Sequence, residues 1–256
     1  MVTESAPQTP APLIDVLMRI GGPVRIEWIQ TALNSLNAQT GADWHLFARI
    51  EPTQGVDASP PMVAAVLTTM VAPSRLTWAY GPDEGAGVAY NALASMIPAS
   101  RGPAPIVALL DCDDRLATAE AMATICALAA ANPDAGAFHS RALEVGPDGA
   151  TIAEPKPFPP TIRLVDLLHS QPLHHMRAWR RSALATSGGW REMFTVAAHA
   201  DLTLRLAVRY RVPFARTEAV LYEWRRHPEQ VTARCRDQVV AYLQHARRDI
   251  KRWAVV

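Results

Sequence analysis

Three acidic residues follow directly on a short apolar run, and this arrangement constrains the fold more than any other feature of the chain. The run is residues 106–110, and the next four residues are Asp111, Cys112, Asp113 and Asp114. An apolar run of this length is typical of a buried strand in a parallel sheet. Carboxylates grouped at the end of a strand repel one another unless a cation is held there. Because oxygen ligands suit Mg²⁺ and Mn²⁺, the sequence predicts a metal–diphosphate site at the carboxyl edge of a sheet.

Strand-like and helix-like segments alternate through the first half of the chain. Apolar spacing predicts strands at residues 13–20, 44–50, 76–80 and 106–110, and helices at residues 27–38, 61–70, 88–97 and 117–131. This alternation is typical of an α/β fold with a Rossmann-like, mostly parallel sheet flanked by helices. Ligands of such folds bind beyond the carboxyl ends of the strands. We therefore expect the loops there to bring Arg19, Glu51, Asp83 and Glu84 close to the acidic run.

The second half has a different pattern, with fewer strands and more irregular segments. It predicts extended runs at residues 136–145 and 150–153, a proline-rich linker at 155–160, helices at 162–169, 180–187 and 201–210, a strand at 220–224 and a final helix at 237–253. We expect this part to form a smaller mixed region.

Composition excludes several classes of protein. The formal net charge of +1 argues against nucleic acid as a partner, because proteins that bind it usually carry a strong basic excess. The three cysteines form no C-x-x-C pair, which suits a reducing compartment and offers no zinc site. Residues 1–12 have neither the basic nor the apolar segment of a signal peptide, so we expect a disordered leader and a cytoplasmic protein.

Several candidate residues also have simpler structural interpretations. The glycines at 81, 85 and 87 lack the spacing of a nucleotide-binding motif and indicate a flexible loop. Asp114 and Asp201 could each cap a helix, and Asn91 is typical of a structural hydrogen-bonding residue. His227 is a stronger candidate, because imidazole can bind a metal and the arginines before it can bind phosphate.

The final helix carries its basic residues mostly on one face. Favourable interaction of these charges with the helix C-terminus is the simpler explanation. Association with the inner face of a membrane is the alternative.

Taken together, the motifs of this chain resemble those of family-2 glycosyltransferases of the GT-A fold. The resemblance covers about residues 13–232, and its motifs lie at residues 33–40 with 43–44, at Asn91, at residues 110–114, at 188–190, at 201–206 and at 224–232. It implies that residues 13–134 form the nucleotide-sugar-binding half of one GT-A domain. Residues 135–256 would then form the acceptor-side half and the C-terminal helix.

The resemblance implies an inverting transfer of a sugar from a nucleotide diphosphate donor to an acceptor hydroxyl. A Mg²⁺ or Mn²⁺ ion would neutralise the leaving diphosphate. A UDP-sugar is favoured, with GDP or dTDP as alternatives, and the acceptor would be a carbohydrate, a lipid-linked molecule or a small molecule. A homodimer is left open.

The resemblance also assigns roles to individual residues. Asp111 would reach the ribose or the donor sugar, and Asp113 would bind the metal with His227. The remaining donor-side candidates are Arg19, Glu51, Asp83, Asn91, Arg225 and Arg226, and the acceptor-side candidates are His174, His175, Gly189 and Trp190. Glu51 stands where the family often has aspartates.

One departure from the family pattern concerns the catalytic base. The usual Glu-Asp-x-Asp-Leu sequence is replaced here by residues 198–202, Ala-His-Ala-Asp-Leu. The base position falls on His199, which can accept a proton near neutral pH, and Asp201 is the second choice. Loss of activity is the alternative, which would leave a non-catalytic protein that binds a nucleotide sugar or a partner. A sugar nucleotidyltransferase is disfavoured, because residues 18–23 lack the expected glycine-rich loop with arginine and lysine.

Overall fold

The computed structural model describes residues 13–53, 58–101, 105–154, 166 and 175–253. The leader at 1–12, the proline-rich linker, the helix expected at 162–169 and His174 lie outside these residues, apart from the single position 166.

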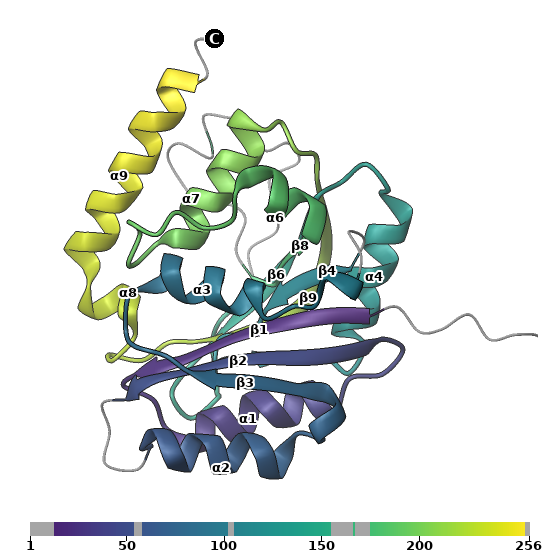
Figure 1. Cartoon of the computed structure of the whole chain (residues 1–256), viewed down its shortest axis with the longest axis vertical. Helices are drawn as coiled ribbons and strands as arrows, with labels where there is room; N and C mark the ends of the chain where they lie inside the picture. The colour runs from purple at the N-terminus through teal and green to yellow at the C-terminus, as the bar shows by residue number, and fades with distance from the viewer. Residues whose placement is uncertain (1–12, 54–57, 102–104, 155–165, 167–174, 254–256) are drawn as a thin grey trace, which may run out of the picture.

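One sheet of nine strands runs through the described part of the chain (Figure 1). The order along it is β3-β2-β1-β4-β8-β6-β9-β5, and β7 pairs with β6. The strands are β1 (Leu13–Gly22), β2 (Asp43–Thr53), β3 (Leu76–Tyr80), β4 (Ile106–Leu109), β5 (Arg115–Leu116), β6 (Ala137–Val145), β7 (Thr151–Ala153), β8 (Arg177–Arg180) and β9 (Phe214–Arg225).

Parallel pairing predominates among the strands of the first half of the chain, and the rest of the sheet is mixed. Strands β3, β2, β1 and β4 are parallel neighbours, and β6 is parallel to β9. Strand β8 lies antiparallel between β4 and β6, and β5 lies antiparallel to β9. The predicted fold class, α/β with a mostly parallel sheet, is confirmed.

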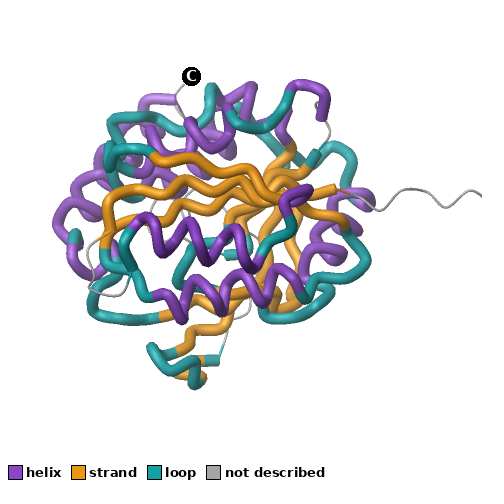
Figure 2. The backbone as a smooth tube through the Cα atoms, turned by 60° about the horizontal axis from the view of Figure 1, so that its bottom comes forward, coloured by secondary structure: helices purple, strands orange, loops and turns teal. Residues whose placement is uncertain are grey.

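Three helices cover one face of the sheet, namely α1 (Ile26–Asn37), α2 (Pro60–Met70) and α4 (Ala121–Ala131). In α1 the apolar residues recur three or four positions apart, so that Ile29 and Leu33 are fully buried. Figure 2, with the underside brought forward, shows helices crossing in front of the strands. The short 3₁₀ turn η1 (Pro73–Arg75) leads from α2 into β3, and the turn η2 (Ala99–Arg101) precedes β4.

The other face carries α3 (Ala86–Ser95), α6 (Arg181–Ser187) and α7 (Ala198–Leu204), with a second apolar cluster beneath them. In that cluster Leu17 of β1 and Leu109 of β4 lie next to Trp179 of β8 and Trp190. The helix α8 (Val231–Arg234) leads into α9 (Arg236–Trp253), which packs through Ala246 and Ile250 into the same cluster.

The structure differs from the sequence-based expectation at the sheet centre and in one helix. Strand β8 was not predicted, because four residues that include two arginines show too little periodicity. The helix expected at 201–210 begins at Ala198 and becomes a π-helix, η3, over Arg205–Arg209. Strand β9 begins at Phe214, six residues before the expected strand.

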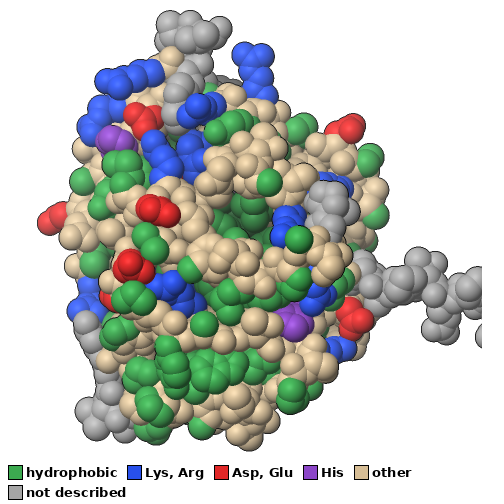
Figure 3. Space-filling view, viewed as in Figure 1, with side chains coloured by type: hydrophobic (Ala, Val, Ile, Leu, Met, Phe, Trp, Pro, Cys, Tyr) green, Lys and Arg blue, Asp and Glu red, His purple; other side chains and the backbone are tan. Residues whose placement is uncertain are grey.

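The described helices include none long and apolar enough to cross a membrane. Basic side chains gather on the part of the surface where α9 lies, at the upper left of Figure 3. They include Lys251 and Arg252 in the last turn, where positive charge favours a helix.

Candidate active site

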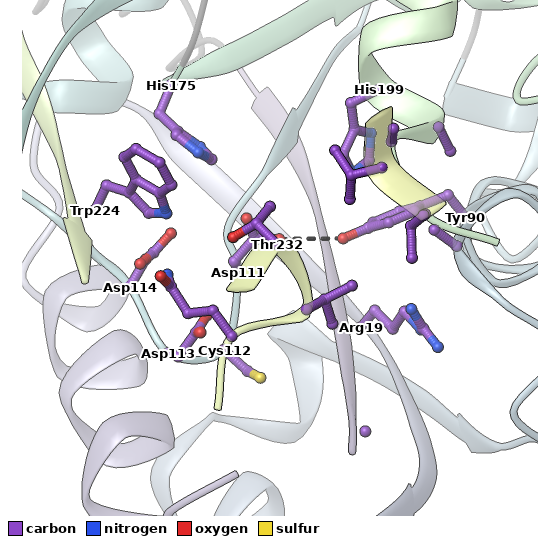
Figure 4. Close-up of a pocket in the computed structure, with 18 of the residues that line it drawn as sticks. Arg19, Tyr90, Asp111, Cys112, Asp113, Asp114, His175, His199, Trp224 and Thr232 are labelled. Atoms are coloured by element: carbon purple, nitrogen blue, oxygen red, sulfur yellow. Dashed lines mark hydrogen bonds between the residues drawn. The ribbon is translucent and has the colours of Figure 1, made fainter. Parts of the chain in front are cut away.

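The acidic run lies where β4 leaves the sheet, beside the end of β1. Leu109 is paired with Leu17, and the amide of Leu110 donates a hydrogen bond to the carbonyl of Leu17 over 3.2 Å. A cavity of about 270 Å³ opens at this point (Figure 4). Its polar lining includes Arg19, Tyr90, Asp111, Asp113, Asp114, His175, Arg177, His199, His227 and Glu229. The predicted clustering of acids at the carboxyl edge is therefore present.

Asp111 is held by two tyrosines. The hydroxyl of Tyr90 donates to its carboxylate over 3.1 Å, the contact dashed in Figure 4, and the hydroxyl of Tyr222 accepts from its amide over 3.0 Å. Burial raises the pKa of Asp111, and the charge of Asp113 adds to the shift, while Arg177 opposes it. A bound cation would relieve this cost.

Asp114 is buried and does not cap a helix, because α4 begins only at Ala121. Its carboxylate accepts the backbone N–H of Arg225 over 2.7 Å and thereby ties the acidic run to β9. Burial holds its pKa well above the ordinary value, and the charges of Asp113 and Asp111 raise it further.

Asp113 faces the imidazole of His227 across the cavity wall. Nε2 of His227 lies 2.9 Å from Oδ2 of Asp113, and Nδ1 lies 3.2 Å from Oε2 of Glu229. The histidine is buried against Trp28, with ring centroids 4.4 Å apart. The structure thus brings together Asp113 and His227, the two residues predicted to bind the metal.

A second set of potential ligands consists of Asp111, Asp114 and His175, whose ligand atoms all lie within 4.8 Å of one another. His175 stacks on Tyr222 with ring centroids 4.5 Å apart. His175 was expected on the acceptor side, whereas it lies beside the acids (Figure 4).

The two arginines after Trp224 have different surroundings from those predicted. Arg225 donates through Nε to the carbonyl of Asp113 over 2.8 Å and through Nη1 to the carbonyl of Pro147 over 2.9 Å. Arg226 lies over the ring of Trp224 and 3.5 Å from a carboxylate oxygen of Glu144. Neither lines the described cavity, so their geometry fits support of the acidic run better than contact with phosphate.

The carboxyl-terminal parts of β1 and β2 and the loop after β3 meet at this edge of the sheet. Arg19 donates to Glu51 over 2.7 Å and to Asp83 over 2.9 Å, and Arg49 binds Glu51 and Glu84, each over 3.1 Å. Of this group only Arg19 lines the cavity. Glu51 and Asp83 therefore position Arg19.

The glycine-rich loop allows close packing. A Cβ at Gly85 would lie 2.6 Å from Cα of Thr195, and a Cβ at Gly87 would overlap the carbonyl oxygen of Arg191. Their segment donates backbone hydrogen bonds to the carbonyls of Thr195 and Phe194 over 2.9 and 3.0 Å. The loop was predicted to be flexible, but its glycines let the start of α3 contact the segment before α7.

Asn91 makes structural hydrogen bonds, as its simpler interpretation expected. Its amide donates to the carbonyl of Trp190 over 2.7 Å, and its oxygen accepts the backbone N–H of Trp190 over 2.9 Å. A Cβ on Gly189, whose φ is +73°, would lie 2.6 Å from the same oxygen. Asn91 and Gly189 together set the position of Trp190.

His199 lines the cavity opposite the acids (Figure 4). Its Nδ1 accepts the indole N–H of Trp190 over 3.0 Å, and its ring meets that of Tyr90 edge-on at 4.4 Å. Burial lowers its pKa well below the ordinary value, and the charges of Arg177 and Arg19 lower it further. The ring is therefore neutral near pH 7.

Asp201 lies among arginines, outside the cavity lining. Its carboxylate accepts hydrogen bonds from Nε of Arg205 over 2.8 Å, from Nε of Arg191 over 3.1 Å and from Nη2 of Arg191. Its side chain is 1% exposed. Asp201 therefore does not face an acceptor in this cavity, and the helix-cap interpretation is wrong because Asp201 lies inside α7.

Tyr90, Arg177 and Tyr222 were not recognised in the sequence as parts of the site. Arg177 was missed because β8 itself was not predicted, and only the pairing of β8 with β4 and β6 places Arg177 at the edge of the cavity. The tyrosines gave no local signal, because they reach the acids only through tertiary packing.

No family model and no curated protein sequence match the chain. Solved structures do. Staphylococcus aureus TarS 1–349 in complex with UDP superposes with a TM-score of 0.62 at 14% identity, covering 90% of this chain and 70% of that one. The fold is of the GT-A type. The mannosyltransferase PcManGT from Pyrobaculum calidifontis, in complex with GDP-Man and Mn²⁺, superposes with a TM-score of 0.58 at 17% identity, covering 86% of this chain and 59% of that one.

A longer TarS chain superposes with a TM-score of 0.61 at 13% identity, and the present chain spans 43% of it. At such identities the likeness establishes the fold and not the activity.

Proposed function

We propose that this chain is an inverting, metal-dependent glycosyltransferase of family 2. It would move a sugar from a nucleotide diphosphate donor to an acceptor oxygen. The observation that carries the proposal is the position of Asp111, Asp113 and Asp114 in a cavity at the carboxyl end of β4, within a GT-A fold. The UDP and GDP-Man complexes of proteins with this fold support a nucleotide sugar as the donor, and a UDP-sugar is the first choice.

The chemistry of the acidic run fits a divalent cation. On an octahedral ion with ligand bonds of 2.0–2.1 Å, neighbouring ligand atoms lie about 3 Å apart. The distance of 2.9 Å between Asp113 Oδ2 and His227 Nε2 matches that spacing. We assign the ion to this pair, and Asp111, Asp114 and His175, whose ligand atoms lie within 4.8 Å of one another, form the alternative set. When bound, Mg²⁺ or Mn²⁺ would neutralise charge on the leaving diphosphate.

The other residues would position the donor. Asp111, fixed by Tyr90 and Tyr222, would accept hydroxyl groups of the ribose or the donor sugar. Arg19, held by Glu51 and Asp83, would keep a positive charge at the cavity wall. The acceptor would approach from the side of His199, opposite the acids, as inversion requires.

A non-catalytic nucleotide-sugar-binding protein is the second candidate, and one observation favours it. The carboxylate nearest to the usual base position, Asp201, is engaged by Arg191 and Arg205. Such a protein would bind the donor but transfer nothing to any acceptor.

The test combines donor binding with turnover. Melting temperatures would be measured with UDP, GDP and dTDP, each with and without Mn²⁺, because a ligand that binds the folded state raises the melting temperature. We expect one diphosphate to stabilise the native chain only when Mn²⁺ is present, and the corresponding nucleotide sugar to be hydrolysed slowly. The variant Asp113→Asn should lose both effects, while Asp134→Asn, at an exposed position outside the cavity, should keep them. Absence of any diphosphate effect would refute the proposed function.

A further inference from the structure

Arg177 lines the cavity and has no role in the donor site proposed above. Strand β8 is antiparallel to β4, so its first residue lies at the carboxyl end of β4, beside the cavity. Arg177 and Trp179 share one face of β8, because side chains alternate along a strand. On that face Trp179 stacks on His199, with ring centroids 6.5 Å apart. Arg177 and His199 therefore lie on the same side of the sheet, next to the same cavity.

The guanidinium of Arg177 makes no hydrogen bond or ion pair with any residue that the structure describes. Three other arginines of this region are engaged: Arg19 by Glu51, and Arg191 and Arg205 by Asp201. Its positive charge nevertheless reaches the site, since it acts on both Asp111 and His199. A half-buried guanidinium without a partner among the described residues has the chemistry to bind a carboxylate or a phosphate in a two-pronged contact.

The hydrogen bond from Trp190 determines what His199 can offer to the cavity. An indole N–H can only donate, so Nδ1 of His199 must carry the accepting lone pair. In a neutral imidazole the proton then lies on Nε2. His199 is therefore a hydrogen-bond donor toward a ligand, and it has no free nitrogen to take a proton from an acceptor hydroxyl.

We propose that the acceptor nucleophile is an oxyanion, a phosphate or carboxylate oxygen that is already ionised and is bound by Arg177 and by the Nε2–H group of His199. This inference rests on the proposed glycosyl transfer. A lone pair of the oxyanion forms the new bond to the anomeric carbon. The bond from that carbon to the diphosphate oxygen breaks, and its electron pair leaves with the nucleoside diphosphate. No proton is transferred, so the site needs no base.

The two sources of an oxyanion in this cavity are the acceptor and the diphosphate of the donor. The two can be distinguished, because Arg177→Met would weaken the binding only of the species that Arg177 contacts. If Arg177 binds the acceptor, the KM for the acceptor rises at least tenfold while the Kd for UDP changes less than twofold. A matched control is Arg75→Gln, which removes an exposed arginine paired with Asp43 outside the cavity.

The experiment compares decyl phosphate, decanoate and decanol as acceptors for the native chain, with Mn²⁺ and the nucleotide sugar found by the thermal-shift screen. We expect a glycosyl phosphate or glycosyl ester as product, with transfer to decanol at least a hundredfold slower. Transfer to decanol at an equal or higher rate would overturn the inference, and so would donor hydrolysis without transfer to either anion. An equal loss of UDP affinity in Arg177→Met would reassign Arg177 to the donor. Failure of the native chain to bind any nucleotide diphosphate would instead refute the proposed function.

Discussion

The indole N–H of Trp190 donates a hydrogen bond to Nδ1 of His199 over 3.0 Å. Trp190 itself is fixed, because Asn91 binds its backbone N–H and carbonyl groups and the ring is buried against Trp179. A residue at the position of a catalytic base is thus held in the tautomer that donates.

Replacing this donor tests the tautomer directly. In Trp190→Phe the aromatic packing is largely kept and the hydrogen bond is lost, so we expect His199 to populate both neutral tautomers. The ¹⁵N chemical shifts of the ring nitrogens would show an unprotonated Nδ1 in the native chain and an averaged pattern in the variant. An unprotonated Nε2 in the native chain would contradict the assignment.

Single substitutions distinguish the two candidate sets of metal ligands. Asp113→Asn and His227→Gln should each weaken the Mn²⁺-dependent binding of a nucleotide diphosphate by tenfold or more, because each removes a ligand of the proposed pair. His175→Gln should weaken it less than threefold. Calorimetric titration of the diphosphate at fixed Mn²⁺ gives these affinities, and the reverse ranking would assign the ion to Asp111, Asp114 and His175.

Asp201 should prove structural. Its carboxylate is 1% exposed and binds Arg205, whose side chain is 4% exposed. Removing one member of such a buried pair typically costs roughly 3–5 kcal/mol. We expect Asp201→Asn to lower the free energy of unfolding by that order in urea denaturation, while the folded fraction still binds the donor. A stable variant that binds the donor but has lost all turnover would instead support Asp201 as the base.

Asp15 should make stability depend on pH. It is fully buried in β1, neither carboxylate oxygen has a hydrogen-bond partner among the described residues, and Nε of Arg101 lies 3.8 Å away. Burial raises its pKa, with Arg101 and Arg181 opposing. Because the folded state then binds the proton more tightly, the stabilising contribution of Asp15 is complete below about pH 4 and is lost as the pH rises toward the folded pKa.

The variant Asp15→Val has no carboxyl group at this position, so its stability does not fall for this reason as the pH rises. Its melting temperature relative to the native chain should therefore increase between pH 4 and pH 7, whereas the exposed control Asp134→Val should show a constant difference. A relative melting temperature of Asp15→Val that falls with rising pH would refute the sign of this effect.

Gly87 should tolerate no side chain. A Cβ would overlap the carbonyl oxygen of Arg191, and this backbone cannot move without disturbing the hydrogen bond from Gly87 to Phe194. Gly22 is a useful comparison, because its φ is +70° but no atom lies within 4 Å of its Cβ position. Gly22→Ala should lower the free energy of unfolding by only ~1–2 kcal/mol, the cost of placing a side chain on left-handed backbone. We expect a larger loss in thermal unfolding for Gly87→Ala, together with weaker donor binding, and equal losses would contradict the close-packing role.

Much of the first half could be predicted from local patterns. The strands in residues 13–110 and the helices between them follow from apolar periodicity, since burial on a sheet face or helix face imposes a period that local sequence records. The acidic run at the end of β4 follows from the same logic. Strand β8 could not be predicted in this way. A four-residue central strand is selected by pairing with its neighbours β4 and β6 and not by its own propensity.

The sequence by itself determined the fold class, the acidic run at the carboxyl edge and the replacement of the usual carboxylate by His199. Only the tertiary structure decided how these residues are used. Asp201 is engaged by two arginines, His199 is held as a donor by Trp190, and Arg177 lies beside the cavity without a protein partner among the described residues. The physical reason is that charge, tautomer and hydrogen-bonding capacity depend on contacts between segments distant in the chain, such as residues 90, 111, 177 and 199, and local sequence does not record such contacts.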